Sequence, residues 1–423
     1  MAVNYIQIIT EQKAECAKIL NEGNVLRTAE SMISLDSNLA QIITGIRRSG
    51  KSTLAHRVLK NRNYAYLNFD DERLINLQPH ELNDILESLY VVYGEFDYLL
   101  MDEVQNVEQW HLFVNRLLRN NIKIILTGSN SKLLSKEMAT HLTGRYMLVE
   151  LFTFSFREYL KAMNYSGFSY VTAKEKGILQ NHFNAYLSGG GFPEIVGGEA
   201  QLPYITALFE GITTRDIVFR YQIRYVKTLR DIALYLLDNY GNKISFNRIK
   251  KLFGLGSENT AKNYVSYLEE AWLTATLCKF SYKKQESLRY RKIYLVDTAF
   301  AALSSNYSAN TGRLLENIVF LQLKRFAIYQ NYEVYFYKKN YEVDFLIYRN
   351  RKVEELIQVS IGLLDESLRK RELRALLLAS EELGTDKLTV ITMNEEEERI
   401  SDNKIIKVVP VIKWLFEFEN DNR

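Results

Sequence analysis

A multidomain α/β fold is predicted by three observations on the amino-acid sequence. The 423 residues exceed what one hydrophobic core usually organises, so two or three domains are expected. Short apolar runs alternate with helical segments over residues 40–151, which is typical of a parallel sheet with flanking helices. A helix–helix–hairpin pattern follows, and then a helix with three strand-like segments. The chain should therefore continue into a helical domain and a second α/β domain.

Composition narrows the class of protein. Apolar residues make up 47% of the chain and charged residues 25%, which is ordinary for a soluble globular protein. No apolar run is long enough to span a membrane, and charges interrupt the N-terminal segment, so neither a membrane partner nor a signal peptide is expected. Two cysteines and five scattered histidines form no disulfide framework or metal-ligand spacing, which favours a cytoplasmic location.

Residues 45–52, GIRRSGKS, match the phosphate-binding pattern G-x-x-x-x-G-K-[ST], between a strand-like run and a helical one. Glycines allow backbone N–H groups to surround phosphates, and the helix N-terminus adds its positive dipole end. Lys51 is expected at the β- and γ-phosphates, Ser52 at Mg²⁺ and Thr53 near the α-phosphate. The residues expected to bind ATP are Gly45, Ile46, Arg47, Arg48, Ser49, Gly50, Lys51, Ser52 and Thr53.

A phosphate-binding loop requires an acidic partner, and residues 98–103 supply it. A buried strand over 98–101 is followed by Asp102 and Glu103. Asp102 is predicted to bind Mg²⁺, and Glu103 to orient and deprotonate the attacking water. The next strand, within 121–130, ends in Thr127, Ser129 and Asn130, of which Ser129 is the preferred sensor of the γ-phosphate.

Three further residues have two interpretations each. Asp70 and Asp71 end the strand-like segment that begins at residue 64, where they either face the ligand edge of the sheet or cap the next helix. Arg145 follows a glycine just before another apolar strand. It is predicted either as an arginine finger, acting in its own subunit or in a neighbouring one, or as a surface ion-pair partner.

These motifs resemble, in order, those of AAA-superfamily ATPases widespread in bacteria and archaea. The resemblance is carried by ITGIRRSGKSTL, YLNFDDERL, LLMDEVQNVEQW, ILTGSNSKLLS and LTGRYMLVELFTFSFREYL, and continues in LSGGGFPEIV, GRLLENIVFLQL and EVDFLI. Such proteins carry a P-loop domain followed by a C-terminal domain of unknown function. The resemblance implies ATP and Mg²⁺ as ligands, and relatives often form rings in which arginines act across subunits.

The expected domains are a P-loop ATPase over residues 1–165 and a helical lid and hinge over 166–224, with a glycine-rich turn at 185–198. Residues 225–296 then follow the order of a winged helix-turn-helix. Glu258, Asn259, Thr260, Lys262 and Asn263 would begin the helix that enters a DNA groove, and the cations of 279–292 would lie on the wing. Acidic residues on the same helix weaken this case, so duplex DNA and a protein partner both remain open.

Residues 297–423 follow the order of PD-(D/E)XK nucleases, with Glu316 on a helix and Asp344 on a strand. Gln358 and Ser360 stand where an active enzyme offers Glu-x-Lys. An uncharged amide is a poor Mg²⁺ ligand and serine supplies no cation, so this site is predicted to be degenerate, unless Glu355 and Lys352 substitute.

The leading hypothesis is an Mg²⁺-dependent ATPase whose nucleotide state repositions a winged-helix and nuclease-like C-terminal half, with DNA, a protein partner or a second copy of the chain as partner. One alternative is a nuclease regulated by ATP. The other is a regulator that reads DNA or a protein and uses nucleotide only to lock its shape.

Overall fold

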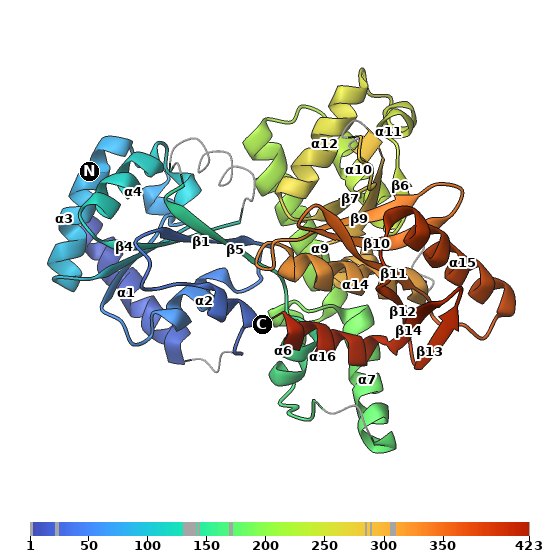
Figure 1. The fold of residues 1–423 in the computed structure, drawn as a ribbon. Coiled ribbons are helices and arrows are strands. Elements are labelled where there is room, and N and C mark those ends of the chain that lie inside the picture. The colour runs from blue at the N-terminus through green and yellow to red at the C-terminus, as the bar shows by residue number, and fades with distance from the viewer. Residues whose placement is uncertain are drawn as a thin grey trace. The chain divides into compact units, whose positions relative to one another are not determined.

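The computed structural model describes residues 3–21, 25–129, 142, 144–168, 172–283, 286–287, 290–304 and 310–422. The chain forms two compact units, residues 1–153 with 270–272, and residues 154–269 with 273–423 (Figure 1). Residues 154–165, which the sequence analysis places with the ATPase, pack in the second unit. The predicted α/β multidomain fold is confirmed, with a parallel sheet first and helical and mixed-sheet parts after it.

The first unit is built on a five-stranded parallel sheet in the order β2-β3-β4-β1-β5. Its strands are β1 (Ala40–Gly45), β2 (Tyr64–Asn68), β3 (Tyr98–Asp102), β4 (Lys123–Gly128) and β5 (Tyr146–Leu151). β1 and β3 are buried along their whole length, as expected where helices cover both faces of a parallel sheet. The register aligns the carboxyl ends of the strands, so the residues that end β1, β3 and β4 share one edge.

Helices flank this sheet (Figure 1). They are α1 (Tyr5–Asn21), α2 (Lys51–Val58), α3 (Leu82–Tyr93) and α4 (Trp110–Arg119), with the short turns η1 (Thr28–Met32), η2 (Glu72–Leu74), η3 (Pro79–Glu81) and η4 (Val104–Asn106). α2 packs against β1, β3 and β4, so its N-terminus lies at the edge where those strands end. This places the helix that follows the glycine loop beside the acidic strand.

The second unit begins with helices: α6 (Phe156–Ala162), α7 (Ala173–Gly189), α8 (Pro193–Val196), α9 (Gln201–Gly211) and the π-helical η5 (Ile212–Phe219). The glycine-rich turn after α7 is held by close packing. Gly190 has φ +77°, and a Cβ there would lie 1.8 Å from the Asp297 carboxylate, which accepts a 2.9 Å hydrogen bond from the Gly191 N–H. These contacts hold the turn that is predicted to be a hinge, and the hinge role stays a prediction.

Next come α10 (Val226–Asp238), β6 (Lys243–Ile244), α11 (Phe246–Leu252), α12 (Glu258–Glu270), β7 (Thr274–Cys278) and β8 (Arg291–Leu295). The three strands form an antiparallel sheet in the order β6-β8-β7. The Ser257 hydroxyl accepts a 3.1 Å hydrogen bond from the Thr260 N–H and so caps α12, as serine does at helix starts.

The chain ends in a six-stranded mixed sheet in the order β13-β14-β12-β11-β10-β9. After η6 (Thr298–Leu303), its elements are α14 (Thr311–Ala327), β9 (Glu333–Lys338), β10 (Glu342–Arg349), β11 (Lys352–Val359), α15 (Glu366–Leu383), β12 (Leu388–Thr392), β13 (Glu397–Ser401), β14 (Lys404–Pro410) and α16 (Val411–Asp421). α14 and α15 both pack against β11. Within the described part of the chain, no helix has the length and apolar character needed to cross a bilayer.

Candidate functional site

The loop between β1 and α2 has a backbone that only glycine fits at its first position. Gly45 has φ +143°, and a Cβ there would lie 2.0 Å from the Leu151 carbonyl oxygen, which also accepts a 3.2 Å hydrogen bond from Ile46. Arg48 and Gly50 have φ of +63° and +88°, so the chain turns through left-handed conformations before α2 begins at Lys51. The sequence motif therefore forms a tight loop that ends at a helix N-terminus.

Lys51 is buried, and its Nζ donates to the carbonyl oxygens of Gly45 at 3.3 Å and Ile46 at 3.0 Å. Two hydroxyls of the same segment of the chain, Ser49 Oγ and Thr44 Oγ1, are buried and have no hydrogen-bond partner among the described residues. Buried hydroxyls usually find a partner in the protein or a ligand. The ammonium and the unpartnered hydroxyls fit a loop that receives phosphate oxygens.

Asp102 ends β3 as a buried carboxylate beside this loop. The Ser52 hydroxyl hydrogen-bonds to it, and Thr127 at the end of β4 donates to its Oδ1. The pKa of Asp102 is raised to about 6, mainly by burial and also by the neighbouring Glu103, while Ser52 and Lys51 oppose the shift. A carboxylate that shares a hydroxyl-lined edge with Ser52 has the donor set that Mg²⁺ takes in proteins.

Glu103 follows in a left-handed conformation with φ +51°, which turns its side chain toward the end of β4. The Ser129 hydroxyl donates to Glu103 Oε2 at 3.2 Å, the Ser129 N–H lies 3.4 Å from the same atom, and Gln105 also donates to it. The structure therefore pairs Thr127 with Asp102 and Ser129 with Glu103. Asn130 lies outside the described residues.

Arg145 is exposed and lies at the other edge of the sheet. The Arg145 carbonyl accepts a hydrogen bond from the N–H of Ala40, where β1 begins. The start of β1 pairs with the start of β5, so Arg145 lies at the amino ends of both strands. At about 3.3 Å per strand residue, β1 separates it from Gly45 by roughly 20 Å. Arg145 is therefore badly placed to reach the loop of its own subunit, and a role across subunits remains a prediction.

Arg27 also belongs to this site, although no sequence motif predicts it. This buried arginine donates from Nη1 to the Ser49 carbonyl at 2.7 Å and from Nη2 to the Phe152 carbonyl at 2.6 Å, which ties the glycine loop to the segment after β5. No motif surrounds it, so no sequence signal could have found it. Asp71, by contrast, accepts from the Arg73 N–H at 3.0 Å and pairs with its guanidinium, so the capping interpretation describes it.

A second polar cluster lies in the second unit. Lys292 Nζ from β8 contacts Glu316 at 3.0 Å and Asp344 at 3.2 Å, and it also lies 3.0 Å from Glu342. The Tyr294 hydroxyl donates to Glu316 at 2.6 Å. Lys292 had been counted only among the wing cations, and the structure brings it from outside the nuclease-like segment to the centre of the predicted acidic site.

Of the other residues predicted for this site, one lies in the cluster and two make their contacts elsewhere. Gln358 accepts from the Asp344 N–H at 3.3 Å and donates to Glu372, so it belongs to the cluster. Ser360 donates to the Gly362 carbonyl at 2.8 Å, and its hydroxyl is therefore directed to the backbone of its own loop. Glu355 contacts Thr389 at 2.6 Å and Lys387 at 2.8 Å, which places it in a different set of contacts.

Burial and nearby charges shift the pKa values of two acids of this cluster in opposite directions. The pKa of Glu316 is raised to about 7, mainly by burial and also by Asp344, while Lys292 and Tyr294 oppose the shift. At Glu342 burial acts in the same direction, but Lys292 and Lys243 outweigh it and hold the pKa at about 2. A cavity of about 860 Å³ opens beside the cluster.

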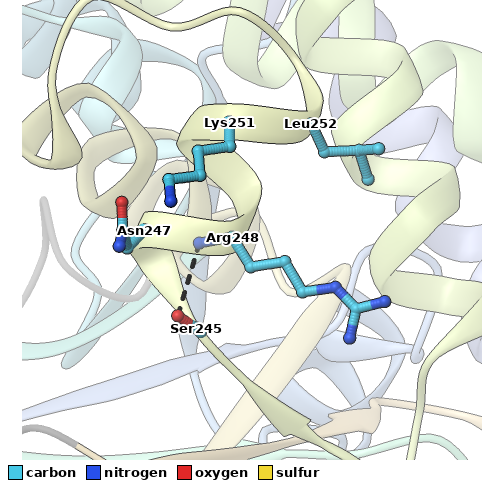
Figure 2. Close-up of a pocket in the computed structure, with 5 residues that line it drawn as sticks. All are labelled: Ser245, Asn247, Arg248, Lys251 and Leu252. Atoms are coloured by element: carbon cyan, nitrogen blue, oxygen red, sulfur yellow. Dashed lines mark hydrogen bonds between the residues drawn. The ribbon is translucent and has the colours of Figure 1, made fainter.

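A shallower hollow of about 500 Å³ lies along α11 and is shown in Figure 2. The Ser245 hydroxyl accepts a 3.3 Å hydrogen bond from the Arg248 N–H and caps the helix. The residues that line this hollow are Ser245, Asn247, Arg248, Lys251 and Leu252. Arg248 and Lys251 are exposed and form no ion pair within the described parts of the chain, so this face carries two cations that are free to bind anions.

Comparisons with known proteins divide the chain into three segments. Residues 37–160 match a family described as an AAA domain, and residues 180–311 and 311–414 match two domains of unknown function, DUF8612 and DUF4143. The uncharacterized protein MJ1544 of Methanocaldococcus jannaschii is 36% identical over 421 residues, covering 95% of this chain and 92% of that protein. An uncharacterized protein of Haemophilus influenzae is 29% identical, covering 77% and 83%.

Two solved structures are also similar. The Walker-type ATPase paby2304 of Pyrococcus abyssi has 16% identity and a TM-score of 0.40, covering 67% of this chain and 96% of that one. Cdc6p from Pyrobaculum aerophilum has 12% identity and a TM-score of 0.26, covering 72% and 98%.

Proposed function

This chain belongs to the AAA superfamily of ATP-binding proteins, and on that premise we propose that its first unit binds Mg²⁺–ATP at residues 45–53 and hydrolyses it. One observation carries the proposal. Lys51, Ser52, Asp102 and Glu103 meet at the carboxyl edge of one parallel sheet, with Thr127 and Ser129 donating to the two acids. Ligands of open α/β sheets bind at this edge.

Each residue has a proposed role that follows from its contacts. Lys51 exchanges its bonds to the Gly45 and Ile46 carbonyls for bonds to phosphate oxygens. Ser52 and Asp102 would hold Mg²⁺, which neutralises phosphate charge when bound. Glu103 accepts the proton of the attacking water, and Ser129 keeps that carboxylate oriented. Arg145 is proposed to act on the site of a neighbouring copy, because it lies far from its own.

The test compares Lys51→Ala and Glu103→Gln with the wild-type chain. Lys51→Ala should abolish ATP binding, whereas Glu103→Gln should bind ATP and hydrolyse it at most at about one hundredth of the wild-type rate. Lys60→Ala is the matched control, because Lys60 is exposed just beyond α2. Equal ATP affinity of the Lys51→Ala and Lys60→Ala variants would remove the site assignment, and unchanged turnover in Glu103→Gln would remove Glu103 from the base role.

A second candidate function is DNA contact by residues 225–296. The order α10, β6, α11, α12, β7 and β8, with a three-stranded antiparallel sheet, supports a winged helix-turn-helix. On α12, Asn259, Lys262 and Asn263 are exposed. The exposed cations of α11 would contact phosphates beside them. We propose that nucleotide binding in the first unit changes how this surface is presented.

A mobility shift with duplex DNA at increasing salt tests this function. The Arg248→Gln, Lys251→Gln variant should bind more weakly and with a salt slope reduced by about two, since each lost phosphate contact lowers the slope by about one. Lys174→Gln on α7 is the control, because it removes an exposed charge elsewhere in the same unit. No shift at low salt would favour a protein partner for this surface.

A further inference from the structure

The carboxylate cluster of the second unit already contains its own cation. Glu316, Glu342 and Asp344 come from α14 and β10, and all three lie within 3.2 Å of Lys292 Nζ. An ammonium has three N–H donors, so the three contacts use all of them. Close carboxylates repel one another unless a cation lies between them, and here the buried Lys292 is that cation.

A divalent cation at this position would have to displace Lys292. Displacement would leave a buried ammonium without its partners, which is among the most unfavourable changes in a protein interior. Two of the carboxylates also have other partners, because Lys243 contacts Glu342 at 2.6 Å and the Val359 N–H donates to Asp344 at 3.1 Å. The cluster is therefore arranged to remain without metal.

The cavity beside the cluster has an excess of positive charge. Its lining includes six cations (Lys292, Arg313, Lys338, Lys370, Arg371 and Arg374) and four acids (Glu316, Glu342, Asp344 and Glu372), so six minus four leaves a net charge of +2. Its volume of about 860 Å³ is in the usual range for ligand sites, roughly 300–1,000 Å³. Lys370 is paired with Glu366 at 2.7 Å outside the lining, and the remaining excess of positive charge favours an anionic ligand.

Two of the cations are free to bind that anion. Arg313 from α14 and Arg374 from α15 form no ion pair with any residue in the described parts of the chain. Arg371 by contrast is 2.5 Å from Glu372, and Lys338 is 3.2 Å from Glu342. Guanidinium groups present paired N–H donors that match the oxygens of a phosphate.

We propose that this cavity binds a phosphate-bearing ligand without a divalent cation, with Lys292 filling the cation position among the carboxylates and Arg313 and Arg374 contacting the phosphate. The site consists of other residues than the ATP loop, so the proposal does not depend on hydrolysis in the first unit. A free nucleotide and the end of a nucleic-acid strand carry the same phosphate chemistry, and the experiment distinguishes them.

The experiment measures binding to the full-length chain carrying Lys51→Ala, so that the ATP loop does not compete, in buffer with EDTA. The probes are thymidine 5′-monophosphate and a fluorescent, 5′-phosphorylated thymidine octamer, followed by calorimetry and by anisotropy. At least one probe should bind. Adding both Arg313→Gln and Arg374→Gln should weaken the binding of that probe by about tenfold or more. The reason is that losing one hydrogen bond to a charged group lowers affinity by roughly a factor of ten.

Lys407→Gln is the matched control, because it removes an exposed cation on β14, outside the cavity. Binding of the monophosphate identifies a nucleotide site, and binding of the octamer alone identifies a strand end. The proposal is overturned if neither probe binds, if the double variant and the control bind equally, or if binding requires Mg²⁺ or Mn²⁺. It is also overturned if Arg248→Gln with Lys251→Gln removes octamer binding while the cavity variant does not. Should Arg313→Gln unfold the chain, Arg374→Gln alone is compared with the control.

Discussion

Replacing Lys292 with methionine is expected to destabilise the C-terminal sheet strongly. Methionine keeps the length and much of the volume of lysine but removes the charge, so three carboxylates would face one another in a buried site. Removing one partner of a buried ion pair typically costs about 3–5 kcal/mol, because the other charge remains buried without compensation. A cost in this range is expected here, because the side chains of Glu316 and Asp344 that lose Lys292 are only 15% and 11% exposed.

Hydrogen exchange at increasing urea concentration is the suitable assay, because the two compact units need not unfold together. Peptides from α14 and β10 should lose several kcal/mol of protection in Lys292→Met, while peptides from β1 and β3 of the first unit should keep theirs. Lys339→Met is the control, since it breaks an exposed ion pair with Glu382 and should leave protection in α14 and β10 unchanged.

A second substitution separates charge from packing. Adding Glu316→Gln to Lys292→Met should restore part of the lost stability, because one of the three repelling carboxylates becomes neutral. A loss below about 1 kcal/mol in Lys292→Met, far below that expected for a buried pair, would refute the view that Lys292 compensates this cluster. The same view would be refuted if adding Glu316→Gln to Lys292→Met increased the loss of stability.

Three further outcomes are expected. The affinity for Mg²⁺–ATP should be about tenfold lower at pH 5 than at pH 8, because the pKa of Asp102 is raised to about 6. Only the ionised carboxylate, present above that pH, would bind the metal. An equal affinity at both pH values would contradict this role of Asp102. Gly45→Ala should lower the Tm by more than 5 °C, since its Cβ would meet the Leu151 carbonyl at 2.0 Å, while Gly177→Ala, with nothing within 4 Å, should leave the Tm equal or slightly higher. Plasmid DNA incubated with Mg²⁺ or Mn²⁺ and ATP should remain intact; cleavage that disappears in Asp344→Ala would establish the nuclease alternative.

The candidate ATP site could be predicted from sequence because most of its elements are local. A glycine loop with its lysine and serine is contiguous in the chain, and its conformation follows from left-handed positions such as Gly50. The acidic strand lies elsewhere in the sequence, but carboxyl ends of parallel strands meet at one edge, so Asp102 had to come close to Ser52. The apolar run of β3 likewise predicted a buried strand, as found where helices cover both faces of a sheet.

The sequence by itself therefore determined the fold class and the group of residues at the ATP loop. Only the tertiary structure decided which distant side chains complete each site. Lys292 lies 52 positions from Asp344, and Arg27 lies 125 positions from Phe152, so no periodicity or spacing connects either pair. Arg145 is separated from the loop by the register of β5 against β1, which a strand pattern does not contain. The physical reason is that burial energy selects long-range packing without regard to sequence distance, and a buried charge then takes whichever opposite charge that packing brings within reach.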